Sequence, residues 1–427
     1  MMRTSAAVLA AFLLCPLFSN ARAETINAAT CNQSDVQAAV NSASSGATVV
    51  VPAGNCTWTT LSINKALTFQ GAGSGQTKIA LNANPALTLT KQSSVITVTG
   101  FTFSCSANEQ TPHPLVINGA WQGTKPVIFK NNAFNVDGCT PVEALVPGGV
   151  IFSHNSFTGT WDNALLVVKD ASNATSWNTA DSMGTRDTNG LLNVYVEDNT
   201  FVGGSNGVFD CDDNCRMVVR HNTFGYNGKD SGGFNSHGYD TSPYGMRHFE
   251  IYNNSFLLPD KTCTSGNTSL SNVNQWIWIR GGTGVVFDNT FDNLSSQCWG
   301  TKPEVRLSIR AAADPTLIGR TCSNISYPVP RQIGQNHNGT SYFTDPVYFW
   351  GNTGTLTYPE NDDYGWTNTC SNHTWNNFFQ WGRDSINNSI VAGNAKPGYT
   401  AYTYPHPLIQ STSPAPSSPT NLATTVH

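Results

Sequence analysis

The middle of the chain repeats one arrangement of apolar and polar positions. The tripeptide Asn-(Ala/Ser/Thr)-Phe occurs six times, and its Asn spacings are 23, 44, 23, 32 and 35 residues. An apolar residue stands three positions before each Asn, and a Phe stands two positions after it. The six Asn residues are Asn132, Asn155, Asn199, Asn222, Asn254 and Asn289. Two apolar columns at fixed offsets from one polar residue predict pairs of short strands that bend at the Asn.

We expect this Asn to occupy a tight turn that tolerates a left-handed conformation, with its amide bonded to the Asn above and below. A repeat of about 23 residues cannot bury its own apolar face, so it must stack on copies of itself. This predicts an all-β parallel β-helix with three short strands per coil, about 4.8 Å apart. The longer spacings indicate inserted loops or a lost motif, and Asn352 in VYFWGNTG is a decayed seventh copy. A β-sandwich would not hold Phe at one offset six times.

The N-terminal segments are expected to differ from the repeats. Residues 1–23 contain an early Arg3, an apolar run and a small-x-small end, which is typical of a secretory signal peptide. A short amphipathic helix at Ser34–Ala43 would cap the first coil and cover its open edge.

The chain therefore divides into a signal peptide, a parallel β-helix domain at 24–408, and a Ser/Pro/Thr-rich tail or truncated linker at 409–427. No later apolar run is long enough to cross a bilayer, so we expect a secreted protein, extracellular or periplasmic, with no membrane partner.

The amino-acid composition excludes further classes of protein. Only 11% of the residues are charged, and the 37 Gly and 22 Pro argue against a coiled coil or helical bundle. Lys and Arg number 22 against 27 Asp and Glu with no basic run, so we expect no nucleic-acid partner. One of the 11 Cys lies in the signal peptide, and the even remainder in an exported chain indicates disulfides. Cys31 with Cys56 and Cys211 with Cys215 are candidate local pairs, although the sequence leaves the connectivity open.

The segment CNQSDVQAAVNSASSGATVVVPAGNCTW, the stretch ALTFQGAG and the Asn ladder together resemble the pectate-lyase-like superfamily of secreted right-handed parallel β-helix proteins. The resemblance covers roughly residues 25–408 and implies a right-handed helix. It also implies that one sheet and its neighbouring loops form a sugar-binding groove. The strands of that sheet are expected at 165–170, 207–213, 236–241 and 275–281. The superfamily includes lyases, hydrolases, epimerases and phage adhesins, so the resemblance does not decide the reaction.

Inward and outward positions alternate regularly along the last of these strands. Ile277 and Ile279 would face inward, whereas Trp276, Trp278 and Arg280 would face outward. Two exposed indoles in line with a guanidinium would form a substrate-binding platform for sugar rings. The alternative is a long loop that folds over both Trp side chains and buries them.

Neighbouring coils offer catalytic candidates on the same face. His237 could carry a proton near neutral pH, oriented by Asp240, and Lys169 is a further candidate base. Alternatively, His237 satisfies a loop carbonyl. Arg220 and Arg247 are candidate substrate-binding residues that could instead form ion pairs with Glu197 or Glu250.

The densest group of carboxylates is Asp210, Asp212 and Asp213. Three carboxylates within four residues could bind Ca²⁺, or could supply the acid and nucleophile of a hydrolase. The adjacent Cys211 and Cys215 suggest a third interpretation, a disulfide-pinned turn whose Asp residues cap backbone N–H groups. The chain has no G-x-S-x-G elbow and no Cys/His zinc spacing, which disfavours serine-esterase and zinc mechanisms.

We expect a monomer whose partner is a polysaccharide, and of three functions we favour a polysaccharide lyase over the two alternatives. The first is a polysaccharide lyase that cleaves a uronic-acid-containing chain by β-elimination, with Arg280 or Ca²⁺ beside the carboxylate and His237 or Lys169 as the base. The second is a glycoside hydrolase that uses Asp210 and Asp213 as the acid–base pair. The third is a non-catalytic carbohydrate-binding or adhesion β-helix.

Overall fold

The computed structural model describes most of the chain between residues 24 and 410. Not described inside that span are 107–112, 122, 161–163, 171–176, 178, 180–182, 184–186, 204–206, 226–232, 237–244, 258–275, 292–304, 310–320, 322, 324–330, 332, 355–359 and 363–389. The predicted signal peptide lies outside the described residues, as does nearly all of the predicted tail.

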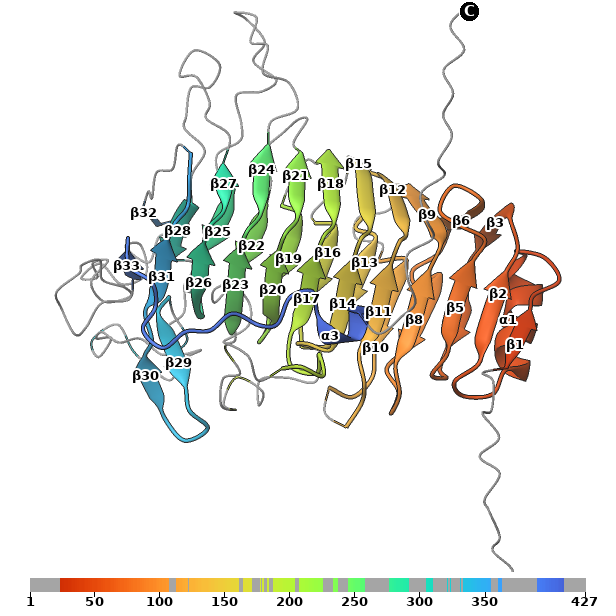
Figure 1. Cartoon of the computed structure of the whole chain (residues 1–427), viewed down its shortest axis with the longest axis horizontal. Coiled ribbons are helices and arrows are strands. Elements are labelled where there is room, and N and C mark those ends of the chain that lie inside the picture. Colours follow the sequence, from red (N-terminus) through yellow and green to blue (C-terminus); the bar gives the residue numbers. More distant parts are fainter. Residues whose placement is uncertain are drawn as a thin grey trace, which may run out of the picture.

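The described chain winds into a parallel β-helix, as the repeat predicts (Figure 1). Three long parallel sheets, of twelve, ten and nine strands, run along it. A typical coil gives one strand to each sheet, so strands three apart in sequence become neighbours in space.

The strand bounds follow. The twelve-stranded sheet contains β1 (Thr25–Asn27), β2 (Thr48–Val51), β5 (Thr68–Gly71), β8 (Ile96–Thr99), β11 (Val127–Lys130), β14 (Val150–Ser153), β17 (Val194–Glu197), β20 (Arg216–Arg220), β23 (His248–Tyr252), β26 (Thr283–Phe287), β31 (Val347–Trp350) and β33 (Ile390–Ala392). The nine-stranded sheet contains β3 (Gly54–Trp58), β6 (Thr77–Leu81), β9 (Phe101–Ser106), β12 (Ala133–Asp137), β15 (Ser156–Thr160), β18 (Thr200–Gly203), β21 (Thr223–Gly225), β24 (Ser255–Leu257) and β27 (Thr290–Phe291). The ten-stranded sheet contains β4 (Leu61–Ile63), β7 (Leu87–Thr90), β10 (Leu115–Asn118), β13 (Val142–Ala144), β16 (Leu166–Val168), β19 (Phe209–Cys211), β22 (Phe234–Ser236), β25 (Ile277–Ile279), β28 (Val305–Ile309) and β32 (Glu360–Asp362). An antiparallel pair, β29 (Gln335–His337) and β30 (Tyr342–Thr344), lies outside these sheets.

The Phe of the repeat forms a continuous stack inside the helix. Ring centroids of successive coils are 4.5, 4.9, 5.0, 4.7 and 4.6 Å apart. The stack contains Phe134, Phe157, Phe201, Phe224, Phe256 and Phe291. Because each ring is buried against the ring of the next coil, the six Phe side chains form one column of the core along the helix axis.

The Asn ladder is confirmed and includes the predicted seventh copy. In each step, the backbone N–H and the side-chain Nδ2 of one Asn donate to Oδ1 of the next Asn along the chain. The last step runs from Asn289 to Asn352, at 3.0 and 2.9 Å. The left-handed conformation belongs to the residue before the ladder Asn, which corrects the expectation. These residues, with φ between 51° and 58°, are Asn131, His154, Asp198, His221, Asn253 and Asp288.

The N-terminal cap and the covalent links agree with the sequence. Helix α1 (Gln33–Ser42) buries Val36, Ala39 and Val40 against the first coil, beside β1 and β2 in Figure 1. The predicted disulfides Cys31–Cys56 and Cys211–Cys215 are present, and a third joins Cys105 to Cys139. In the described part of the chain, none of the helices has the length and apolar character needed to span a bilayer.

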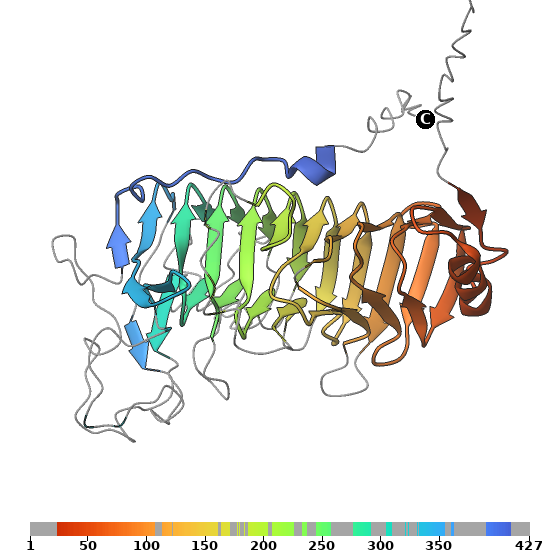
Figure 2. The ribbon, with the colours of Figure 1, turned by 90° about the horizontal axis from the view of Figure 1, so that it is seen from below.

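Residues 393–410, which we name the C-terminal strap, run back from β33 along the outer face of the twelve-stranded sheet (Figure 2). The strap ends in the short helix α3 (Pro407–Gln410). Tyr402 is buried there among apolar residues of the sheet, and Leu408 and Ile409 pack on the same cluster. The strap therefore covers an apolar sheet face that would otherwise meet solvent.

Candidate functional site

One outward-facing row crosses the ten-stranded sheet. Each of its residues is the middle residue of a three-residue strand. The row runs through Glu143, Val167, Asp210, Asn235 and Trp278. Residues on either side of it, such as Ile277 and Ile279, are fully buried in the core. The strand alternation therefore turns the row outward.

Asp210 is the carboxylate at the centre of the row, and a hydrogen-bonded network fixes its neighbours. Asn235 Nδ2 donates to Asp210 Oδ1 at 3.1 Å, and Arg280 Nη2 donates to Asn235 Oδ1 at 2.7 Å. The backbone N–H of Arg280 donates to Ser236 Oγ, and its Nε donates to the Ser236 carbonyl. The Arg280 guanidinium carbon lies 4.1 Å from the centroid of the Trp278 ring. A buried arginine thus orients Asn235, and Asn235 in turn orients Asp210.

The predicted aromatic platform is only partly present. Trp278 is half-buried at its outward position, as the alternation predicts. Trp276 is wrong as a platform residue, because it is 1% exposed and its ring lies 5.4 Å from that of Phe256 in the core. Arg280 is also buried rather than outward. The reason is that β25 covers only Ile277–Ile279, and alternation does not extend past the ends of a strand.

Asp212 and Asp213 belong to a turn that the Cys211–Cys215 disulfide closes. The backbone N–H of Asp213 donates to Asp212 Oδ1 at 2.9 Å, and the N–H of Cys215 donates to the Asp212 carbonyl. This supports the disulfide-pinned turn. Among the described residues, no three His, Cys, Asp or Glu side chains gather in a way that could hold a metal ion. The three Asp residues around β19 do not form such a group, and a calcium site that also uses carbonyl ligands stays a prediction.

Lys169 belongs to a second cluster on the same face, which we name the Glu143 cluster. Lys169 Nζ lies 2.5 Å from Glu143 Oε1, and His113 Nε2 lies 3.7 Å from the same oxygen. Burial lowers the pKa of His113, and the Glu143 carboxylate opposes that shift. Neither His113 nor Glu143 was predicted from the sequence. The segment PVEA, residues 141–144, pairs in register with the next strand of the sheet, and that pairing could have revealed Glu143.

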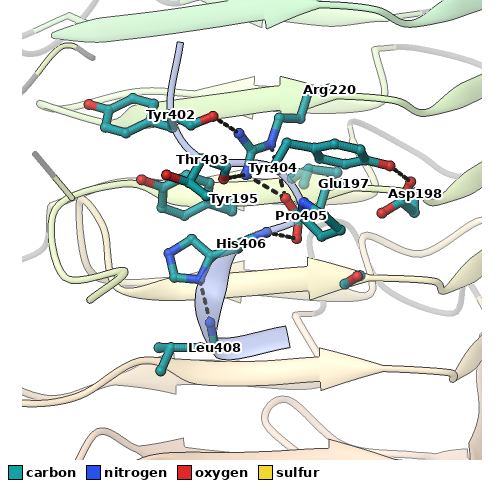
Figure 3. Close-up of polar contacts among 12 residues, drawn as sticks. Tyr195, Glu197, Asp198, Arg220, Tyr402, Thr403, Tyr404, Pro405, His406 and Leu408 are labelled. Atoms are coloured by element: carbon teal, nitrogen blue, oxygen red, sulfur yellow. Dashed lines mark hydrogen bonds and ion pairs between the residues drawn. The ribbon is translucent and has the colours of Figure 1, made fainter. Parts of the chain in front are cut away.

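Arg220 and Arg247 are wrong as substrate-binding residues, since both are fully buried away from the ten-stranded sheet. Arg220 forms the ion pair with Glu197 that was the stated alternative, at 2.7 Å. It also donates to the carbonyls of Tyr402 and Thr403 in the strap, at 2.8 and 2.9 Å (Figure 3).

Arg247 donates to the carbonyls of Thr179 and His337, and its guanidinium lies 4.6 Å from the centroid of the Trp177 ring. The remaining candidates, His237 and Asp240, lie outside the described residues, directly after β22.

Comparisons with known proteins add little to this geometry. No protein-family model matches the sequence, and neither does any curated protein. The chain is similar to the family 28 exopolygalacturonase of Yersinia enterocolitica at 11% identity, over 80% of this chain and 78% of that chain, with a TM-score of 0.32. It is also similar to the catalytic domain of a GH87 alpha-1,3-glucanase, a D1069A variant in complex with nigerose. That match has 12% identity over 88% of this chain and 68% of that chain, with a TM-score of 0.28. Identities and TM-scores this low support no argument about activity.

Proposed function

We propose that this protein is an exported glycoside hydrolase that binds a polysaccharide along the outer face of the ten-stranded sheet. The observation that carries the proposal is the position of Asp210. Its carboxylate is half-buried in the outward row, bonded to Asn235, with Trp278 farther along the row. A carboxylate held by a hydrogen-bonded network, two strands from an aromatic ring on the same face, suits sugar binding and acid–base chemistry.

Asp210 and Asp213 are assigned as the acid–base pair. One carboxylic acid gives its proton to the oxygen of the glycosidic bond as that bond breaks. The other carboxylate takes a proton from water, whose oxygen bonds to the anomeric carbon, or first attacks that carbon itself. Both Asp residues are half-buried and lie in one coil, Asp210 in β19 and Asp213 in the turn that follows it, which supports assigning them to the same linkage.

The buried state of Arg280 favours hydrolysis over β-elimination. A lyase needs a cation beside the substrate carboxylate, and Arg280 was the residue considered for that task. Its side chain is fully buried and donates to Asn235 and Ser236, so it faces the protein rather than a substrate.

One observation favours elimination instead. Lys169, whose side chain is 37% exposed, is held by Glu143 on the same face and could act as the base of a lyase.

Export is supported by the three disulfides, which form and persist in oxidising compartments.

The deciding experiment incubates the protein with plant, algal and microbial polysaccharides, with and without calcium. New reducing ends and the ultraviolet absorbance of an unsaturated uronyl end are recorded together. Hydrolysis gives reducing ends without absorbance, whereas elimination gives both. Absorbance would replace the hydrolase proposal with a lyase that uses Lys169. If neither signal rises, the hydrolase proposal fails on these polysaccharides, and carbohydrate binding without cleavage becomes the function to test.

Variants test the catalytic roles that we assign to Asp210 and Asp213. Asp210→Asn and Asp213→Asn should each lower the rate by about 10² to 10⁴-fold, as for a lost general acid or base. Asp288→Asn is the matched control, because Asp288 is an exposed carboxylate at a left-handed turn position that Asn tolerates. Full activity of both site variants would overturn the assignment.

A further inference from the structure

A groove follows the outer face of the nine-stranded sheet. Its volume is about 580 Å³, within the range of roughly 300 to 1,000 Å³ that is usual for ligand sites. Five residues that line it occupy the same register position on the consecutive strands β3, β6, β9, β12 and β15. They are Thr57, Ala80, Ser104, Asn135 and Thr158. Four strand steps of about 4.8 Å make the groove roughly 19 Å long, parallel to the helix axis.

The shape of the groove follows from side-chain size. Ala80 and Ser104 are small and half-buried, so they form the floor, whereas Thr57, Asn135 and Thr158 are exposed at its two ends. Farther along the same row comes Val202, which does not line the groove.

The floor is held rigidly from inside the helix. The rings of Phe103, Phe134 and Phe157 lie on the inner face of the same strands, with successive centroids 5.5 and 4.5 Å apart. The disulfide between Cys105 and Cys139 ties the end of β9 to the turn after β12. A groove that is already rigid loses little conformational entropy when it binds a ligand.

The lining indicates the chemistry of the ligand. Asp137 is the single ionisable side chain among the lining residues, which include no Lys, no Arg and no aromatic ring. A polyanion such as a nucleic acid would find no cation there. Hydroxyl and amide groups flank a small apolar patch at Ala80. The Thr158 hydroxyl donates to Asn135 Oδ1 at 3.1 Å, which fixes the orientation of that amide. Such a surface matches a neutral ligand that carries both hydroxyl and C–H faces.

We propose that this groove is a second carbohydrate-binding site, which holds a neutral oligosaccharide along the helix axis and takes no part in cleavage. It lies on a different sheet from the Asp210 row. Its role of keeping a polymer attached during cleavage elsewhere rests on the proposed function, whereas the binding itself does not.

The test is a methyl NMR titration of the full chain, with labelled Ala and Thr residues, in the Asp210→Asn background. Cellohexaose, xylohexaose and β-1,4-galactohexaose are the probes. At least one should shift the methyl signals of Thr57, Ala80 and Thr158 together, in a saturable way. Ser104→Trp fills the floor and should weaken this binding at least tenfold. Thr200→Trp, on an exposed residue of the same sheet outside the groove, should leave it unchanged.

Two results would overturn the proposal. The first is that none of the three hexaoses moves the groove methyl signals, and the second is that Ser104→Trp binds as tightly as the unaltered groove. If Ser104→Trp does not fold, Asn135→Ala decides in its place, because that exposed side chain can be removed without disturbing the core. Cleavage is assayed separately, so turnover by the Asp210→Asn variant would contradict the proposed function without affecting the titration.

Discussion

The Arg220 guanidinium and the Glu197 carboxylate lie 2.7 Å apart on neighbouring strands, β20 and β17, and neither side chain is exposed to solvent. The strap completes their surroundings (Figure 3). Its carbonyls at Tyr402 and Thr403 accept from Arg220, and the His406 backbone N–H donates to Glu197 Oε1 at 3.0 Å. The hydrogen bonds of this buried ion pair are therefore complete only when the strap, about 200 positions away along the chain, is docked on the sheet.

Replacing Arg220 with Met should destabilise the protein by about 3–5 kcal/mol, because Glu197 is left buried without its counter-charge. Chemical denaturation measures the loss, and hydrogen exchange should show faster exchange in the strap. The double variant Arg220→Met/Glu197→Gln should recover part of the stability, since it removes both charges. A loss below about 1 kcal/mol in the single variant would show that the ion pair does not hold the strap.

His406 should make strap docking weaker in acid. Burial lowers the pKa of His406 from 6.5 to about 4, so the folded state favours the neutral ring. The neutral ring's contribution to stability is fully present above pH 6.5 and is lost as the pH falls toward 4. The stability difference between wild type and His406→Gln should therefore shrink by up to about 3 kcal/mol between pH 7 and 4. Comparing the two proteins cancels the other titrating groups, and a pH-independent difference would contradict the prediction.

The Asn ladder should be weaker at its end than in its middle. Asn222 Nδ2 donates to the carbonyls of Val196 and Arg220 and to Asn254 Oδ1, all inside the protein. Asn222→Ala should cost about 2–4 kcal/mol, because several buried groups lose their partners. Asn352 is half-buried, so water can replace its contacts, and Asn352→Ala should cost about 1 kcal/mol or less. Equal losses in thermal and urea unfolding would contradict the predicted difference between the middle and the end of the ladder.

Trp276 and Trp278 provide a matched pair for the substrate face. Trp276→Ala should lower the free energy of unfolding by about 3–5 kcal/mol, because it opens a cavity beside Phe256. Trp278→Ala should cost little stability but weaken substrate binding by about 1–2 kcal/mol, or roughly 5- to 30-fold in KM. Denaturation and steady-state kinetics on the active polymer distinguish the two effects. If KM is unchanged in Trp278→Ala, the substrate does not cross this part of the sheet.

The sequence predicts the coils well because each coil repeats its own local pattern. Six copies of Asn-x-Phe were enough to predict the ladder and the Phe column, including the decayed copy at Asn352. The inward orientation of Trp276 could not be predicted, because the ends of β25 are set by contacts with neighbouring coils.

The strap and the Glu143 cluster were also missed. Residues 393–410 carry no repeat, and their partners on the sheet are as far back in the chain as Ile128. The pairing of Glu143 with Lys169 depends on the register between successive coils, which inserted loops of unequal length obscure.

The strap ends on the side of the molecule, far from the last coil. Its final residues, Pro407–Gln410, lie over the apolar cluster that contains Ile128 of β11 and Ile151 of β14, rather than at the last coil. A fluorophore coupled at Gln410 would therefore lie on the side of the molecule. The efficiency of its energy transfer to a dye on β31 would change when the strap detaches from the sheet. Immobilisation through the same point would place the tether on the side of the twelve-stranded sheet and not on the other two sheets.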